Sequence, residues 1–238
     1  LVTGVQTCAL PISSKGLGST LSNPMVGALV VHEGKIIGEG FHRKYGGPHA
    51  EVFALQQVKE KHLLHASTLY VSLEPCSHSG KTPPCTSAII QAGIKKVVIG
   101  MSDPNPLVSG KGIQLLKSQG IEITEHILEA EARELNRRFI CYHEKKRPYL
   151  ILKWARTADG YMAGDGGKTI QITGEQSRML VHKWRTEEMA ILVGSHTVLN
   201  DSPLLSARNW KGRQPLRIVI DPGGSIPEDH MFLDRKST

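Results

Sequence analysis

The chain has 238 residues, enough for one or two domains with a buried core, and its hydrophobic fraction of 39% and charged fraction of 21% argue against disorder. No apolar run approaches the ~20 residues of a transmembrane helix, which excludes a protein that spans a membrane by helices. The net charge of +7 with only 5% aromatic residues favours small phosphorylated ligands over nucleic acid, although a basic surplus also serves simple solvation.

The first fourteen residues, LVTGVQTCALPISS, do not continue logically into the rest of the chain. They lack an initiator Met and the basic region of a signal peptide. We therefore expect residues 1–14 to be a non-native leader, and we expect the protein to reside in the cytoplasm.

Beyond this leader, the chain up to residue 142 alternates between apolar runs and helical periods, which predicts an α/β fold. The Glu33-Gly34 turn joins two apolar runs into a β-hairpin, Pro48 suits the first turn of a helix, and Gly93 suits a helix end. Strands are expected over residues 25–32, 36–41, 68–73, 96–101 and 121–124, with helices over 49–61, 85–91, 112–119 and 128–142. Together they predict one mixed or parallel sheet flanked by helices.

The charged segment EKKRP at 144–148 is the best candidate for a domain boundary. Beyond it we expect strands over residues 149–155, 189–193 and 216–220 and a helix over 175–185. This second unit reads as half of an α/β domain that is cut short, and its last residues, Lys236-Ser237-Thr238, do not resemble a natural terminus.

Candidate metal ligands are concentrated in two short motifs, His49-Ala50-Glu51 and a Pro-rich loop between Cys76 and Cys85. One imidazole and two thiolates are zinc ligands, and three protein ligands leave the fourth position of a tetrahedral ion open to water. Glu51, two residues after His49, is placed to act as a general acid and base on that water. The motifs therefore predict hydrolytic removal of an amine by a zinc enzyme, with Glu51 as the catalytic residue.

Each of these residues, taken alone, also has an ordinary structural interpretation. A histidine at a helix start is often a cap or a surface residue, and two cysteines nine positions apart are often only buried. A closed structural zinc site, with His42 or His78 as the fourth ligand, is a further alternative. The combination of His49, Glu51, both cysteines and their neighbouring prolines favours the metal interpretation.

The order His-x-Glu followed by Pro-Cys is similar to the signature of zinc-dependent nucleobase deaminases. Eight residues separate Cys76 from Cys85, where nucleic-acid and cytidine deaminases have two. With the motifs NPMVG at 23–27 and DPNP at 103–106, this loop makes residues 16–220 resemble the bifunctional deaminase–reductases of riboflavin biosynthesis.

The resemblance implies an α/β protein with a cytidine-deaminase-like mixed-sheet domain followed by a partial dihydrofolate-reductase-like α/β domain. It implies a zinc-dependent pyrimidine deaminase domain over residues 15–146 and the first part of an NADPH-dependent reductase domain over residues 147–238. The family's first helix is missing upstream of Gly16, where the leader stands, and Ser22 replaces the proline that usually precedes Asn23.

For the first domain, the resemblance implies one Zn²⁺ per chain and a phosphorylated diaminopyrimidinone as the substrate. Asn23 and His42 would line the base pocket, and Lys81, Asp103 and Asn105 would help to hold the substrate. An asparagine side chain can read a pyrimidine edge and a lysine can pair with a phosphate, although asparagines at such positions are often ordinary turn residues.

For the second domain, the resemblance implies reduction of the ribosyl group to ribityl by NADPH. The implied cofactor contacts are Ala155, Gln171, Thr197 and Asp201, and the implied substrate contacts are Lys153, Thr169, Arg185, Leu205 and Arg208. Gln171 replaces a tryptophan that is frequent in the family, and a glycine-rich segment that contacts NADPH in the family lies beyond residue 238. We therefore expect weak NADPH binding and no reductase activity from this chain.

Two further functions compete with this interpretation. A deaminase that acts on tRNA or another nucleic acid would use the +7 charge, and a zinc-stabilised binding module would require four ligands. The long cysteine loop, the few aromatic residues and the second domain favour a small-molecule enzyme that needs neither nucleic acid nor membrane and forms a homo-oligomer.

Overall fold

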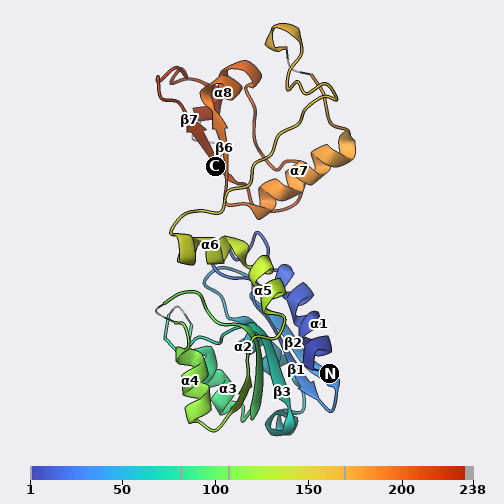
Figure 1. Ribbon diagram of the computed structural model, residues 1–238, viewed down its shortest axis with the longest axis vertical. Helices are drawn as coiled ribbons and strands as arrows, with labels where there is room; N and C mark the ends of the chain where they lie inside the picture. Colours follow the sequence, from blue (N-terminus) through green and yellow to red (C-terminus); the bar gives the residue numbers. More distant parts are fainter. Residues whose placement is uncertain (1, 81, 107, 169, 234–238) are drawn as a thin grey trace. The chain divides into compact units, whose positions relative to one another are not determined.

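The structure is a computed structural model that describes residues 2–80, 82–106, 108–168 and 170–233 (Figure 1). The chain divides into two compact units, residues 1–150 and residues 151–238, and each is described by itself. Within the described ranges, no helix has the length and apolar character needed to cross a membrane.

A five-stranded mixed sheet forms the centre of the first unit, with the strand order β2-β1-β3-β4-β5. Strand β1 runs antiparallel to both β2 and β3, whereas β3, β4 and β5 run parallel to one another. The strands are β1 (Gly27–His32), β2 (Lys35–Phe41), β3 (Thr68–Leu73), β4 (Lys96–Met101) and β5 (Glu122–Thr124). The predicted α/β class is confirmed.

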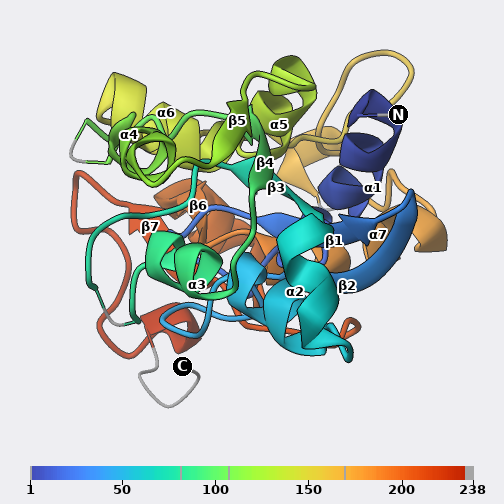
Figure 2. The same ribbon diagram turned by 90° about the horizontal axis from the view of Figure 1, so that it is seen from below.

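Helices cover both faces of this sheet, with α2 and α3 on one side and α1 and α5 on the other (Figure 2). Alternate strand residues point to opposite faces, so Val30 and Val71 pack in the larger core while Leu29 and Tyr70 pack in the smaller one. The helices are α1 (Val2–Ser14), α2 (Ala50–Gln57), η1 (Lys61–Ala66), α3 (Cys85–Gln91), α4 (Lys111–Ser118), α5 (Glu129–Leu135) and α6 (Arg137–Lys145).

Helix α2 packs closely against the hairpin formed by β1 and β2. Glu33 and Gly34 both have positive φ angles, 47° and 76°, which suits a tight two-residue turn. Gly40 of β2 lies directly under the start of α2, because a Cβ added there would be 2.3 Å from the carbonyl oxygen of Ala50. The glycine therefore allows the first turn of α2 to approach the sheet.

We expect Gly40→Ala to lower the free energy of unfolding by about 1–3 kcal/mol, because the new methyl group has no space beneath α2. Chemical denaturation of the full chain would measure this change. Gly80→Ala is the matched control, since a Cβ at Gly80 meets no atom within 4 Å. An unchanged unfolding midpoint in Gly40→Ala would contradict the claim that α2 packs too closely on Gly40 to admit a methyl group.

The second unit contains a two-stranded parallel sheet of β6 (Ala190–Gly194) and β7 (Leu216–Ile220). Its helices are α7 (Glu175–Glu187), α8 (Ser195–Asp201) and the short turns η2 (Asp165–Gly167) and η3 (Met231–Leu233). Val198, Leu205 and Phe232 form its buried core together with one face of the sheet.

Several predicted elements differ from the structure. The helix predicted over 49–61 ends at Gln57, because Val58 is extended and the Lys61 ammonium donates to the carbonyl oxygens of Leu55 and Gln56. The helix predicted over 128–142 is divided at Asn136, whose backbone leaves the helical region. The strand predicted over 149–155 is wrong, since these residues form neither strand nor helix, and α8 was not expected at all.

The first helix, which we expected to be missing, is present as α1. The Gln6 side chain donates a hydrogen bond to the carbonyl oxygen of Val71 at 3.0 Å, and Ser13 donates to Ser72 at 3.2 Å. Residues 2–14 thus form part of the packed unit, while a non-native origin for residues 1–14 stays a prediction.

Candidate active site

The three predicted metal ligands are placed by the starts of two helices and the end of one strand. His49 immediately precedes α2, Cys85 is the first residue of α3, and Cys76 lies three residues beyond the end of β3. Residues separated by up to 36 positions are therefore brought to one end of the sheet.

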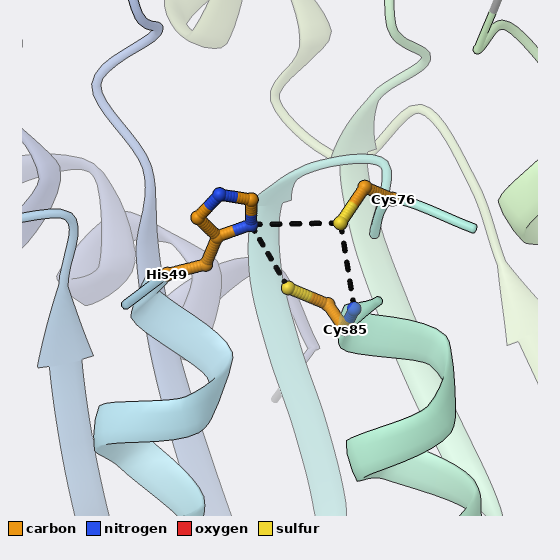
Figure 3. Close-up of side chains that lie close together, drawn as sticks. All are labelled: His49, Cys76 and Cys85. Carbon is orange, nitrogen blue, oxygen red and sulfur yellow. Dashed lines mark hydrogen bonds between the residues drawn. The ribbon is translucent and has the colours of Figure 1, made fainter. Parts of the chain in front are cut away.

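The side chains of His49, Cys76 and Cys85 converge on one point (Figure 3). The Nδ1 atom of His49 is 3.1 Å from Sγ of Cys85 and 3.5 Å from Sγ of Cys76. The backbone amide of Cys85 donates to Sγ of Cys76 at 3.4 Å, which fixes the second sulfur. All three ligand atoms lie within 4.8 Å of one another.

This donor set fits zinc. A tetrahedral ion with ordinary Zn–N and Zn–S bonds separates its nitrogen and sulfur ligands by about 3.5 Å, close to the spacing found here. The Cys85 thiol donates to Cys76 and lowers the pKa of Cys76 to about 4, while the same bond and burial raise the pKa of Cys85. A divalent cation would favour the thiolate at both positions.

A fourth protein ligand is not found among the described residues, where His49, Cys76 and Cys85 form the only group of this kind. His42 already uses both ring nitrogens, because its Nε2 accepts from the Asn23 amide at 3.1 Å and its Nδ1 donates to the carbonyl oxygen of Pro48 at 3.1 Å. The geometry therefore favours an open site over the closed structural one.

Glu51 lies on the first turn of α2 and is only 2% exposed. Burial raises the pKa of its carboxyl group, whereas the His49 ring lowers it. Its Oε2 atom is buried and has no hydrogen-bond partner among the described residues. A buried carboxyl oxygen of this kind, in the wall of the cavity beside the ligands, is suited to exchange a proton with a bound molecule.

A cavity of about 300 Å³ opens in front of these residues. It is lined by His49, Glu51 and Cys76 together with the predicted substrate contacts Asn23, His42, Asp103 and Asn105. Burial raises the pKa of Asp103 to about 6, and its Oδ1 accepts from the backbone amide of Asn105 at 2.8 Å. Lys81, also predicted to contact the substrate, lies outside the described residues.

Two residues that support this cavity were missed by the sequence analysis. Glu74, which follows β3, is 4% exposed, and an acidic residue at the end of an apolar strand could have signalled a buried carboxylate. Asn136 is 2% exposed; its Oδ1 accepts from the backbone amide of Met25 at 2.8 Å and its Nδ2 donates to the carbonyl oxygen of Met25 at 3.0 Å. No local pattern could have revealed this pairing, because 111 positions separate the two residues.

Asn136→Ala should leave both backbone groups of Met25 buried without their partner, at a cost of about 1–3 kcal/mol for each group. Urea denaturation of the full chain would measure the loss. The exposed amide of Gln114 supplies the control, since Gln114→Ala removes a side chain of similar size from the surface. Equal stability of the two variants would show that the Asn136–Met25 bridge contributes nothing.

In the second unit, part of the predicted reductase set is brought together around Ser206. Arg185 donates to the carbonyl oxygen of Ser206 at 2.9 Å, and Arg208 donates to its hydroxyl oxygen at 3.4 Å, beside the buried Leu205. His182 also lies 3.0 Å from that carbonyl oxygen. Burial and the positive charge of the nearby Arg208 lower the pKa of Arg185.

The remaining predicted positions of the second unit are more scattered. Thr197 and Asp201 lie one turn apart on α8. Lys153, Ala155 and Gln171 lie between residues 151 and 173, a segment whose described part contains only the turn η2. Thr169 lies outside the described residues.

Comparison with known proteins supports both units. Residues 5–101 match the family model described as the zinc-binding region of cytidine and deoxycytidylate deaminases, and residues 148–238 match the RibD C-terminal domain. The riboflavin biosynthesis protein RibD of Aquifex aeolicus is 51% identical over 220 residues, which are 92% of this chain and 61% of that protein. The crystal structure of Acinetobacter baumannii RibD, form 1, has a TM-score of 0.91 at 41% identity and covers 98% of this chain and 67% of that one. The chain belongs to the RibD family.

A second solved RibD-type structure leads to the same assignment. The diaminohydroxyphosphoribosylaminopyrimidine deaminase/5-amino-6-(5-phosphoribosylamino)uracil reductase of Thermotoga maritima has a TM-score of 0.88 at 47% identity, with 94% of this chain and 64% of that chain covered. The chain spans about three fifths of the length of the curated RibD proteins that it matches. The match to the zinc-binding region contains His49, Glu51, Cys76 and Cys85, and it begins at residue 5, inside the predicted leader.

Proposed function

We propose that residues 15–146, which lie within the first unit, form a zinc-dependent hydrolytic deaminase domain that acts on a phosphorylated diaminopyrimidinone. The observation that carries this proposal is the buried, unpartnered Oε2 of Glu51 in the wall of a cavity that also receives His49 and Cys76, with Cys85 beside them. A structural metal site would not require an ionisable group with a free acceptor next to it.

The roles of the residues follow from their positions. His49, Cys76 and Cys85 would hold one zinc ion, which supplies Lewis-acid polarisation of a water molecule. Glu51 accepts a proton from the attacking water and delivers it to the leaving amine, so that a ring C–NH₂ group and water become a carbonyl group and ammonia. His42, held with its proton on Nδ1, orients the Asn23 amide toward the cavity, where that amide can hydrogen-bond to the pyrimidine edge.

The substrate is assigned from the family and from the cavity. The Thermotoga maritima relative is named for diaminohydroxyphosphoribosylaminopyrimidine, and a cavity of about 300 Å³ suits a single pyrimidine ring. Asp103 and Asn105 line the same cavity and would contact the remaining polar groups, and Lys81 would pair with the phosphate.

The test is release of ammonia by the zinc-loaded chain from that diaminopyrimidinone, with cytidine and a tRNA as competing substrates. Turnover of the diaminopyrimidinone alone supports the proposal, and turnover of the tRNA alone would replace it with the nucleic-acid alternative. A gel-shift titration with salt adds a second criterion, because binding through a phosphate backbone weakens steeply as salt increases.

For residues 147–238 we propose membership in an NADPH-dependent reductase domain that acts on the ribosyl group of the deaminated product. The RibD C-terminal match over residues 148–238 supports this assignment. Arg185 and Arg208, which both donate hydrogen bonds to Ser206, add support because arginine side chains can bind a phosphate through two hydrogen bonds. Lys153, Thr169 and Leu205 would complete the substrate site, and Ala155, Gln171, Thr197 and Asp201 would contact NADPH. Thiolate ligands suit the reducing cytoplasm, and we retain a homo-oligomer as part of the proposal.

A further inference from the structure

A single buried carboxylate joins the strand that leads to Cys76 with a segment that lines the same cavity. Glu74 immediately follows β3, and its backbone amide continues the sheet by donating to the carbonyl oxygen of Met101 at 2.9 Å. The side chain is 4% exposed and lies two residues before the metal ligand Cys76.

Both oxygens of Glu74 accept hydrogen bonds from the backbone of residues 103–113. Oε2 accepts from Asp103 at 3.2 Å and from Gly110 at 2.9 Å, while Oε1 accepts from Gly112 at 3.0 Å and from Ile113 at 3.4 Å. Four main-chain donors on one carboxylate make an arrangement that an uncharged side chain of the same size cannot reproduce.

Three of these donors lie at the start of α4, which begins after Gly110 without a side-chain cap of its own. The first amides of a helix have no partner inside it, so Glu74 supplies the cap from a distant strand. The contact is close, since a Cβ added to Gly112 would lie 1.9 Å from the carbonyl oxygen of Pro75. Pro75 is the residue between Glu74 and Cys76.

We propose that Glu74 is a positioning residue of the deaminase: it fixes the wall that carries Asp103 and Asn105 at a set distance from the metal ligand Cys76. Both Asp103 and Asn105 line the cavity, and the first of them is bound directly to Glu74 through its amide. This role rests on the proposed deaminase function. Glu74 would hold the segment that carries Asp103 and Asn105 close to the metal ligand Cys76.

Glu74→Gln is the most informative variant, because it keeps the size of the side chain and replaces one acceptor oxygen by an NH₂ donor. Each carboxylate oxygen accepts from two backbone amides, so the new NH₂ group would face two N–H donors whichever oxygen it replaces. Two of the four hydrogen bonds would therefore be lost. We expect KM for the diaminopyrimidinone to rise about tenfold while kcat falls less, with zinc retained at one ion per chain. Addition of Glu74→Gln to Asn105→Ala should raise KM little further, because both changes act through one wall.

Ile121→Val serves as the matched control for a general loss of stability. Ile121 is buried just beyond the C-terminal end of α4, whereas the amides that bind Glu74 lie at the other end of that helix. Its KM and kcat should equal those of the parent chain. Equal KM in Glu74→Gln and the parent, or a fall in activity that only follows the fraction of folded protein, would overturn the positioning role.

Hydrogen exchange gives a readout that does not depend on turnover. In Glu74→Gln the amides of Asp103, Gly110, Gly112 and Ile113 should exchange at least about tenfold faster than in the parent chain, and those in Ile121→Val should not. If the parent chain released no ammonia, the proposed function would fail. The exchange rates of these four amides would still show whether Glu74 holds this segment in place. Unchanged exchange in Glu74→Gln would reject that role even in an active enzyme.

Discussion

Glu51→Gln is expected to lower the rate of ammonia release by about 10²–10⁴-fold while one zinc ion per chain is retained. The amide has nearly the shape of the carboxyl group and fits the same buried position, but it cannot accept the proton of the attacking water. Because Glu51 is not among the proposed metal ligands, which are His49, Cys76 and Cys85, the variant should keep the metal. Ammonia release and zinc content, measured on the same preparation, separate the two effects.

An exposed carboxylate provides the comparison for this result. The Glu60 side chain is 69% exposed, so Glu60→Gln removes the same charge from a solvated position and should leave the rate unchanged. Loss of zinc in Glu51→Gln would mean that the carboxylate supports the metal rather than the proton transfer. Full activity in that variant would remove Glu51 from the mechanism.

Cys85→Ser is expected to weaken zinc binding by at least about 100-fold and to abolish ammonia release. A serine hydroxyl is a poor zinc ligand, and loss of a direct ligand should exceed the 10–100-fold that follows from loss of an outer partner. The chain without metal should also unfold at a lower temperature, since binding to the folded state alone contributes to stability. Competition with a chelator and thermal unfolding measure these two quantities.

Cys141→Ser is the matched control, because Cys141 is also buried but lies in α6 outside the metal group. Its thiol donates weakly to the carbonyl oxygens of Arg147 and Pro148, and a serine hydroxyl can do the same. This variant should retain zinc and activity. Stoichiometric zinc in Cys85→Ser would contradict the assignment of that cysteine as a ligand.

The group of His49, Cys76 and Cys85 that the structure brings together could be predicted from the sequence, with Glu51 beside it, because the signals are local. Only one residue separates His49 from Glu51, and each predicted ligand directly follows a proline. Helix α3 and strand β3 were also predicted at their observed bounds, since Gly93 and the apolar run of β3 define them clearly.

The parts that were missed depend on partners far away in the chain. The break at Asn136 follows from its bond to Met25, and the role of Glu74 follows from amides that lie beyond β4. The apolar segment 149–155 has the composition of a strand, but a strand also needs a neighbour that supplies hydrogen bonds, and composition does not reveal one. Local sequence patterns therefore predicted residues that line the cavity, whereas the long-range contacts that hold them in place were missed.

The Asn136–Met25 bridge has a practical consequence for the design of shorter fragments of this chain for expression. The zinc-binding match ends at residue 101, so a fragment designed on it would contain the three proposed zinc ligands and Glu51. Such a fragment would lack Asp103 and Asn105, the amides that bind Glu74, and the asparagine that holds the Met25 backbone. A useful fragment of this unit must extend past Asn136, because the residue between α5 and α6 holds the backbone of Met25, which leads into β1.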